Sequence, residues 1–292
     1  MSDLAELYPD FASHWIDAPA GQIFARSKGE GAPLLLLHGF GETNVVWSHI
    51  APQLARRFFV VAMDLRGYGW SAVPDSENGA AYAKRAMAED AVAVMEALGH
   101  AQFALVGHDR GALVGARLAL DHVGRLSKLV LIDALPFDDE GADLQRVGRA
   151  RFLSFSAPQP ENLLALDPAG FLDDALKSAT KSKTLAAIDV RALAHYRAGF
   201  ADPLRLHAVC EDYRAGMSED REALRRDLAA GRKILAPTLA LWGEAAFPAE
   251  AQSPLEAWSV YAADIRGQAL DSGARSPEEA PQAVLAALDA FL

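Results

Sequence analysis

Five residues, Gly107-His108-Asp109-Arg110-Gly111, constrain the fold of this chain more than any other stretch. The apolar run before them, Phe103 to Val106, has the length and flanks of a buried strand, and the run after them, Ala112 to Leu120, is typical of an apolar helix. A sharp turn from a strand into a helix needs glycine or another small residue on both sides of its centre. Gly107 and Gly111 meet that need, so the sequence predicts a strand–turn–helix unit.

The same alternation of strand and helix runs through the first half of the chain and resumes near its end. A helix is indicated by Met87, Ala91, Val94, Met95 and Leu98, and a terminal helix is expected from Glu278. Alternating units of this kind imply a mostly parallel sheet with helices on both faces. An antiparallel hairpin, 14–16 with 22–25, is expected before it. The other predicted strands are 34–37, 58–63, 129–132, 237–242 and 265–270.

The alternation stops after Pro136, and residues 137–227 show helix-like segments without a convincing strand. We interpret them as a helical cap inserted into a core of residues 1–136 and 228–292. Ligands of open α/β sheets bind at the carboxyl ends of the strands, so the cap should lie over the binding crevice.

Composition limits the classes of partner and compartment. The net charge of −11 over 292 residues argues against nucleic acid, which needs a basic face. One cysteine, Cys210, excludes an intrachain disulfide and fits a reducing cytoplasm. The N-terminus lacks a signal peptide, and no apolar run is long enough for a membrane span. We therefore expect a cytoplasmic protein that binds a small-molecule substrate, away from any membrane, with no metal and no cofactor.

Asp109, at the centre of the sharp turn, is the candidate nucleophile. The alternative is an ordinary turn in which Asp109 only caps the following helix. Backbone N–H groups of Phe40, in His38-Gly39-Phe40, and of Arg110 are placed to hold developing negative charge. The alternative for that segment is a plain strand-ending turn with a hydrogen-bonded His38.

A carboxylate nucleophile forms an alkyl ester, and a histidine normally activates the water that breaks it. Asp133 ends a predicted strand and could orient such a histidine, or it could be a solvated strand-end residue. Glu244 occupies the alternative acid position. No histidine follows His207, however, so the expected base is missing from the C-terminal part of the chain.

These motifs resemble the haloacetate (fluoroacetate) dehalogenases of the α/β-hydrolase superfamily, which are close to epoxide hydrolases. The resemblance implies the α/β-hydrolase fold, displacement of halide beside a carboxylate by the elbow aspartate, and homodimers. It assigns Asp109 as nucleophile, Asp133 as the acid, Arg110 as a carboxylate-binding arginine and Tyr213 as a halide-binding tyrosine. It is carried by LLLLHGF, MDLRGYGWS, KRAMAED, GHDRGA, GRLSKLVLID, PENLL, HYRAGFADP, CEDYRAG, LALWG and SGARSPEEAP.

The chain departs from that family at three places. Ala274 stands where the base histidine belongs, and Leu113 replaces a second carboxylate-binding arginine. Phe152-Leu153 replaces a halide-binding His-Trp pair. We expect alkylation of Asp109 to survive and ester hydrolysis to be crippled. Leu113, Phe152 and Leu153 should make the site more apolar, which favours a larger, less charged substrate or none.

Several alternatives stay open at this level. Asp271, Glu278 or Glu279 could replace the base, although the two glutamates also suit the solvated first turn of a helix. His108, His195 and His207 are expected to be structural. The chain could act on a carbon–halogen or epoxide bond. It could instead use Asp109 as the base of an isomerase, lyase or cyclase, or bind a ligand without catalysis.

Overall fold

The computed structural model describes residues 4–136, 144–247 and 252–292. They form one eight-stranded sheet with the order β1-β2-β4-β3-β5-β6-β7-β8. The hairpin of β1 (Ala12–Ala18) and β2 (Gly21–Lys28) is antiparallel, as predicted, and β2 also pairs antiparallel with β4. The remaining pairs are parallel. Their strands are β3 (Ala32–Leu37), β4 (Phe58–Met63), β5 (Phe103–His108), β6 (Leu126–Ile132), β7 (Thr238–Gly243) and β8 (Ile265–Leu270).

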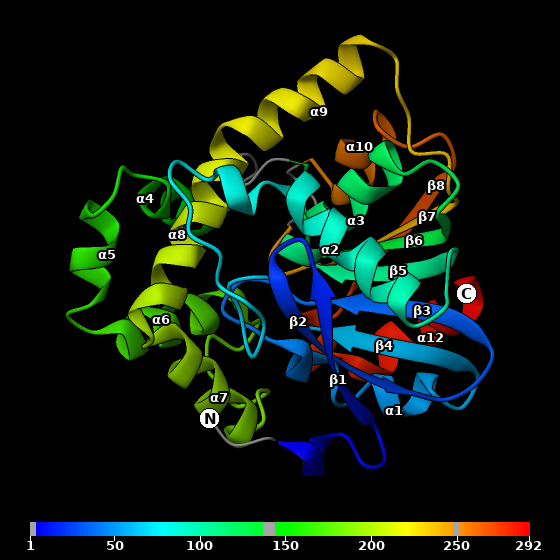
Figure 1. Cartoon of the computed structure of the whole chain (residues 1–292), viewed down its shortest axis with the longest axis horizontal. Coiled ribbons are helices and arrows are strands. Elements are labelled where there is room, and N and C mark those ends of the chain that lie inside the picture. Colours follow the sequence, from blue (N-terminus) through cyan, green and yellow to red (C-terminus); the bar gives the residue numbers. More distant parts are fainter. Residues whose placement is uncertain (1–3, 137–143, 248–251) are drawn as a thin grey trace.

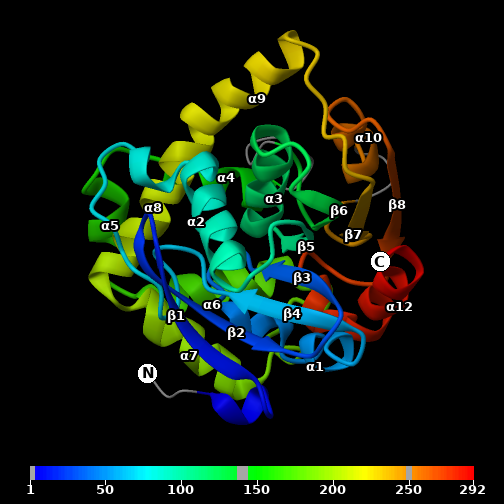
Figure 2. The ribbon, with the colours of Figure 1, turned by 45° about the vertical axis from the view of Figure 1, so that its right-hand side comes forward.

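Helices cover both faces of this sheet, which confirms the predicted fold class. In Figure 1 and Figure 2, α2 (Lys84–Ala97) and α3 (Arg110–Asp121) lie above it, and α1 (Ala51–Leu54) and α12 (Pro281–Phe291) lie below. The central strands are buried on both sides, so β3 is a continuous leucine run that is 0% exposed from Leu34 to Leu37. Burial of this apolar surface is the main stabilising term of the core.

The terminal helix differs from its prediction. The sequence predicted one helix from Glu278, but α11 (Ser276–Glu279) ends before α12 begins at Pro281. Ala280 between them has φ −134° and ψ 49°, outside the helical region. The ring of Pro281 disfavours the helical conformation at the residue before it, so the break follows from the proline.

Residues 144–229 form six helices, and no strand occurs among them; we call them the helical segment. In Figure 1 its helices α4 to α8 gather on one side, where the arrowheads of β3 and β4 point. The predicted cap boundary at residue 137 stays a prediction, because 137–143 lie outside the described residues. The helices are α4 (Leu144–Leu153), α5 (Gln159–Leu164), α6 (Pro168–Ala179), α7 (Val190–Phe200), α8 (Pro203–Met217) and α9 (Glu219–Ala229).

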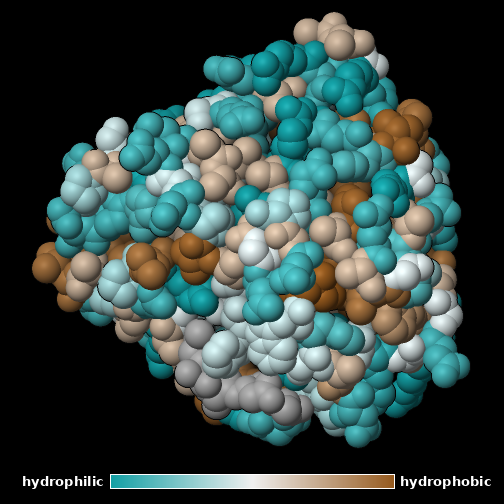
Figure 3. Space-filling model, viewed as in Figure 1, coloured by the Kyte–Doolittle hydropathy of each residue, from teal (hydrophilic) through white to brown (hydrophobic). Residues whose placement is uncertain are grey.

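The outer surface mixes polar and apolar residues. On the face drawn in Figure 3, hydrophilic residues are interspersed with single hydrophobic ones. Within the described part of the chain, no helix has the length and apolar character needed to cross a membrane.

Candidate active site

The turn between β5 and α3 has the strained geometry of a nucleophile elbow. Asp109 has φ +48° and ψ −111°, a conformation that L-residues rarely adopt. A Cβ atom added to Gly107 would lie 2.4 Å from the carbonyl oxygen of Gly111. One added to Gly111 would lie 2.4 Å from the carbonyl oxygen of Leu37. The backbone packing therefore requires both glycines, and the predicted strand–turn–helix unit is confirmed.

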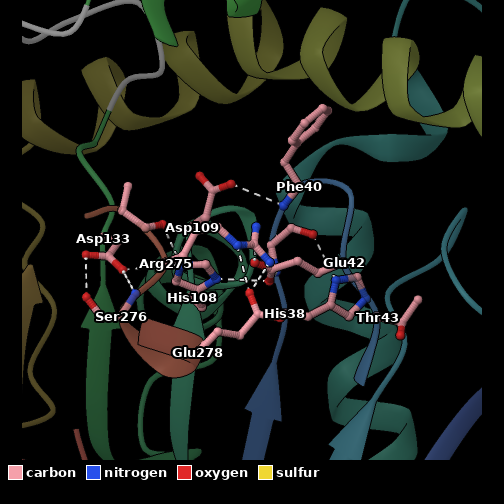
Figure 4. Close-up of polar contacts among 12 residues, drawn as sticks. His38, Phe40, Glu42, Thr43, His108, Asp109, Asp133, Arg275, Ser276 and Glu278 are labelled. Carbon is pink, nitrogen blue, oxygen red and sulfur yellow. Dashed lines mark hydrogen bonds and ion pairs between the residues drawn. The ribbon is translucent and has the colours of Figure 1, made fainter. Parts of the chain in front are cut away.

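The Asp109 carboxylate receives a donor on each oxygen. The backbone N–H of Phe40 donates to Oδ2 at 3.1 Å (Figure 4), and Nη2 of Arg146 donates to Oδ1 at 3.1 Å. The turn that carries Phe40 is anchored by His38, whose Nε2 accepts from the N–H of Leu65 at 3.0 Å. The arrangement places one backbone donor at the carboxylate, as the sequence predicted for Phe40.

Asp109 opens onto a cavity. The cavity is lined by four of the predicted site residues: Phe40, Asp109, Tyr213 and Ala274. Its other charged lining residues were not predicted as site residues, and they are Glu42, His108, Arg146, Arg149 and Arg275.

Asp133 is a buried acid and not a solvated strand end. It is 0% exposed, and its carboxylate accepts from the N–H of Gly243 at 2.9 Å and from the N–H of Ser276 at 2.9 Å. Nε2 of His108 lies 3.3 Å from Oδ2 of Asp133. The alternative acid, Glu244, is exposed, pairs with Lys181 at 3.2 Å and does not line the cavity.

His108 lies between two carboxylates beneath Asp109 (Figure 4). Its Nδ1 is 2.9 Å from Oε2 of Glu42, and its Nε2 is 3.1 Å from the carbonyl oxygen of Ala274. Burial by itself would lower the pKa of His108, but Glu42 and Asp133 outweigh it and raise that pKa well above its usual value. A protonated imidazole donates from both nitrogens and cannot accept a proton, which supports the structural role expected for His108.

Arg110 points away from the cavity and into the helical segment. It is 0% exposed, and its Nη2 donates to Oδ1 of Asp212 at 2.7 Å while its Nε donates to Oδ2 at 3.0 Å. Lys84 also donates to the Asp212 carboxylate. The guanidinium carbon of Arg110 lies 4.4 Å from the ring centroid of Tyr213. In this structure Arg110 joins α3 to α8 and supports Tyr213, so its role as a carboxylate ligand stays a prediction.

Comparison with known proteins places this geometry in a family. The model of the alpha/beta hydrolase fold matches residues 32–257. The chain belongs to the alpha/beta hydrolase fold family. Its relatives include a fluoroacetate dehalogenase from Burkholderia sp, which is 36% identical over 91% of this chain and 89% of the relative.

Two solved structures resemble the hydrolase-fold chain over almost its whole length. A protein of Nostoc sp PCC 7120 assigned as an alpha/beta hydrolase superposes with a TM-score of 0.92 and 41% identity, covering 97% of this chain and 98% of that one. A Pseudomonas aeruginosa protein assigned as an epoxide hydrolase superposes with a TM-score of 0.90 and 39% identity, covering 97% and 96%. The predicted resemblance to dehalogenases and epoxide hydrolases is confirmed.

The three departures from the dehalogenase pattern lie in different surroundings. Ala274, predicted to stand at the position of the base histidine, lines the cavity. Leu113 lines a separate cavity with Lys84, and Leu153 is 0% exposed. Phe152 packs on Phe155 and Phe171, each at 6.1 Å between ring centroids.

The expected apolar character of the site is therefore wrong, because Leu113, Phe152 and Leu153 do not line the Asp109 cavity. The face of α4 toward the cavity carries Arg146 and Arg149, which lie three residues apart and so share one side of the helix.

The three carboxylates considered as replacement bases are engaged elsewhere. Glu278 is buried, pairs with Arg275 and accepts from the Tyr196 hydroxyl at 3.2 Å, so its expected solvation is wrong. Glu279 accepts from the N–H of Gly273 at 2.8 Å. Asp271 is exposed and pairs with Lys181. None of the three lines the cavity.

Arg275, next to Ala274, ties this buried charge network together. Its Nη1 lies 2.9 Å from Oε1 of Glu42, and its Nε donates to Oε2 of Glu278 at 2.7 Å. Burial raises the pKa of Glu42, but His108 and Arg275 outweigh burial and lower it to about 2. No local motif marks four of the charged residues at the cavity, so the sequence did not predict them: Glu42, Arg146, Arg149 and Arg275. Of these, only Arg275 directly follows a predicted site residue, Ala274.

Proposed function

We propose that this chain is an enzyme of the hydrolase type in which Asp109 attacks the carbon of a carbon–halogen or epoxide bond. The observation that carries the proposal is the strained elbow, which holds a carboxylate at the cavity in place of a hydroxyl. Strain of this kind is retained where a side chain must be held in a reactive position. Family membership supports the fold of the site, and the dehalogenase and epoxide hydrolase relatives support the class of bond.

The first step requires only the carboxylate. With a halide substrate, an Oδ–carbon bond forms, the carbon–halogen bond breaks, and halide leaves with the bonding electron pair. No proton is transferred. Each oxygen accepts one hydrogen bond, Oδ1 from Arg146 and Oδ2 from the N–H of Phe40. We assign the attack to Oδ1, which leaves Oδ2 with its backbone donor. The Asp109 carboxylate becomes a neutral alkyl ester.

The second step lacks its base. Water that attacks the ester carbonyl would place negative charge on Oδ2, where the Phe40 N–H can stabilise it. The methyl group of Ala274 cannot accept a proton from that water, and both ring nitrogens of His108 already face oxygen atoms of other residues. By analogy with removal of a triad base, hydrolysis should be slower by roughly 10⁴- to 10⁶-fold. The expected product is a trapped ester.

Intact-mass measurement after incubation with bromoacetate tests the proposal. We expect one carboxymethyl adduct per chain, mapped to Asp109 by peptide analysis, and none in Asp109→Asn. Mapping also separates this adduct from any at Cys210, the single cysteine. Rapid multiple turnover without an adduct would contradict the proposed defect. Product without adduct would instead favour Asp109 as a base, and tight binding with neither would favour a non-catalytic role.

A further inference from the structure

Among the described residues, one cation at the Asp109 cavity has no counter-ion. Arg275 pairs with Glu42 and Glu278, and His108 lies against Glu42 and Asp133. Arg146 pairs with Asp109. Arg149 forms neither an ion pair nor a hydrogen bond within the described residues, and its Nε is buried without a partner.

The aromatic ring of Phe40 holds Arg149 at the cavity. The guanidinium carbon of Arg149 lies 5.3 Å from the centroid of that ring, within range of a cation–π contact. The Phe40 ring also contacts two other aromatic rings, with Tyr213 at 5.7 Å and Phe200 at 5.9 Å between centroids. An aromatic face positions the guanidinium without satisfying its N–H donors. A buried donor of this kind is unfavourable unless a ligand completes it.

We propose that Arg149 is the receptor for an anionic group of the substrate, and that this group is a carboxylate. A guanidinium presents planar paired N–H donors that match a carboxylate. The arginine at the elbow is held by Asp212, and Leu113 faces another cavity. The anion subsite has therefore moved from α3 to α4. This inference rests on the proposed function, since the carboxylate must accompany a carbon that Asp109 can attack.

Alkylation strengthens the subsite. Before the reaction, Arg146 contacts the Asp109 carboxylate at 3.1 Å. Formation of the ester bond neutralises that carboxylate as halide leaves, so Arg146 then faces a neutral group. In our proposal the carboxylate on the newly attached group then lies at Arg149. The subsite should therefore favour alkylation by anionic halides over neutral ones.

A matched pair of halides tests this assignment. Bromoacetate and bromoacetamide have similar size and differ in charge, and both rates of Asp109 adduct formation are measured by intact mass. Arg149→Gln should slow the bromoacetate reaction roughly 10- to 100-fold, as expected for the loss of a hydrogen bond to a charged group. The bromoacetamide rate should change by less than about 2-fold, because the amide has no charge to lose.

Arg151→Gln is the matched control, because Arg151 is an exposed arginine of the same helix and does not line the cavity. It should change neither rate. Circular dichroism should show the Arg149→Gln variant folded, since Arg149 has no hydrogen bond in the described structure to break. Equal bromoacetate rates in wild type and Arg149→Gln would overturn the inference while leaving the proposed nucleophile intact.

Calorimetric titration with glycolate, which carries no leaving halide, separates the two proposals. Arg149→Gln should weaken glycolate binding at least about 10-fold, with glycolamide as the neutral comparison. If wild type forms no Asp109 adduct but binds glycolate through Arg149, the proposed function fails and the subsite stands. If glycolate binds equally to both proteins, or to neither, the subsite is refuted.

Discussion

Replacing Glu42 by glutamine should destabilise the protein strongly. The Glu42 carboxylate accepts from the N–H of Gly39 at 2.8 Å and contacts His108 and Arg275, each at 2.9 Å. Glutamine preserves size and one acceptor oxygen but removes the negative charge. Two buried cations would then lie near each other with less compensation, a situation that costs more than the loss of the contacts alone.

The size of the effect follows from the pKa of Glu42. That pKa falls from 4.5 to about 2 because His108 and Arg275 outweigh the effect of burial. At about 1.4 kcal/mol per pKa unit, the ionised carboxylate contributes about 3 kcal/mol to folding. Because the folded pKa is lower than the unfolded one, this stability is fully present above pH 4.5 and is lost as the pH falls through about 2.

Urea unfolding at pH 7, followed by tryptophan fluorescence, measures the loss. Glu42→Gln should lower the free energy of unfolding by about 3 kcal/mol, in line with about 3–5 kcal/mol for one removed partner of a buried ion pair. Glu244→Gln removes an exposed carboxylate paired with Lys181 and should change it by less than about 1 kcal/mol. A loss below about 1 kcal/mol for Glu42→Gln would refute the reasoning.

Four further outcomes are expected. Ala274→His should raise bromide release from bromoacetate at least about 100-fold by supplying a base; no gain in bromide electrode assays would show that the cavity serves another reaction. Because the pKa of His108 is raised in the folded state, its protonated imidazole stabilises the fold fully below pH 6.5 and less as the pH rises through the folded pKa. The urea midpoint of the wild type should therefore fall above pH 6.5, and that of His108→Gln should lack this His108-dependent fall. Gly111→Ala should give insoluble or unfolded protein, because its Cβ would lie 2.4 Å from a backbone oxygen; native circular dichroism would contradict this. Burial raises the pKa of Cys210 to about 12, so iodoacetamide at pH 7.5 should label it only after unfolding in urea, and fast native labelling would count against the buried position.

Local sequence determined the elbow and the strands that support it. Gly107 and Gly111 flank Asp109 at the centre of the turn, and the apolar runs on either side have strand and helix lengths. These features depend on neighbours within a few residues, where backbone sterics and periodicity act directly. The break at Ala280 was equally local and could have been predicted from Pro281.

The tertiary structure alone decided the charge and shape of the cavity. Glu42 and His108 are 66 residues apart, and Arg149 reaches the Phe40 ring from another element of the chain. A pKa or an ion pair depends on distances across packed elements, and those distances do not exist until the chain folds. The sequence by itself therefore predicted a carboxylate at the centre of the elbow and no histidine after His207, and packing determined that arginines of α4 face that carboxylate.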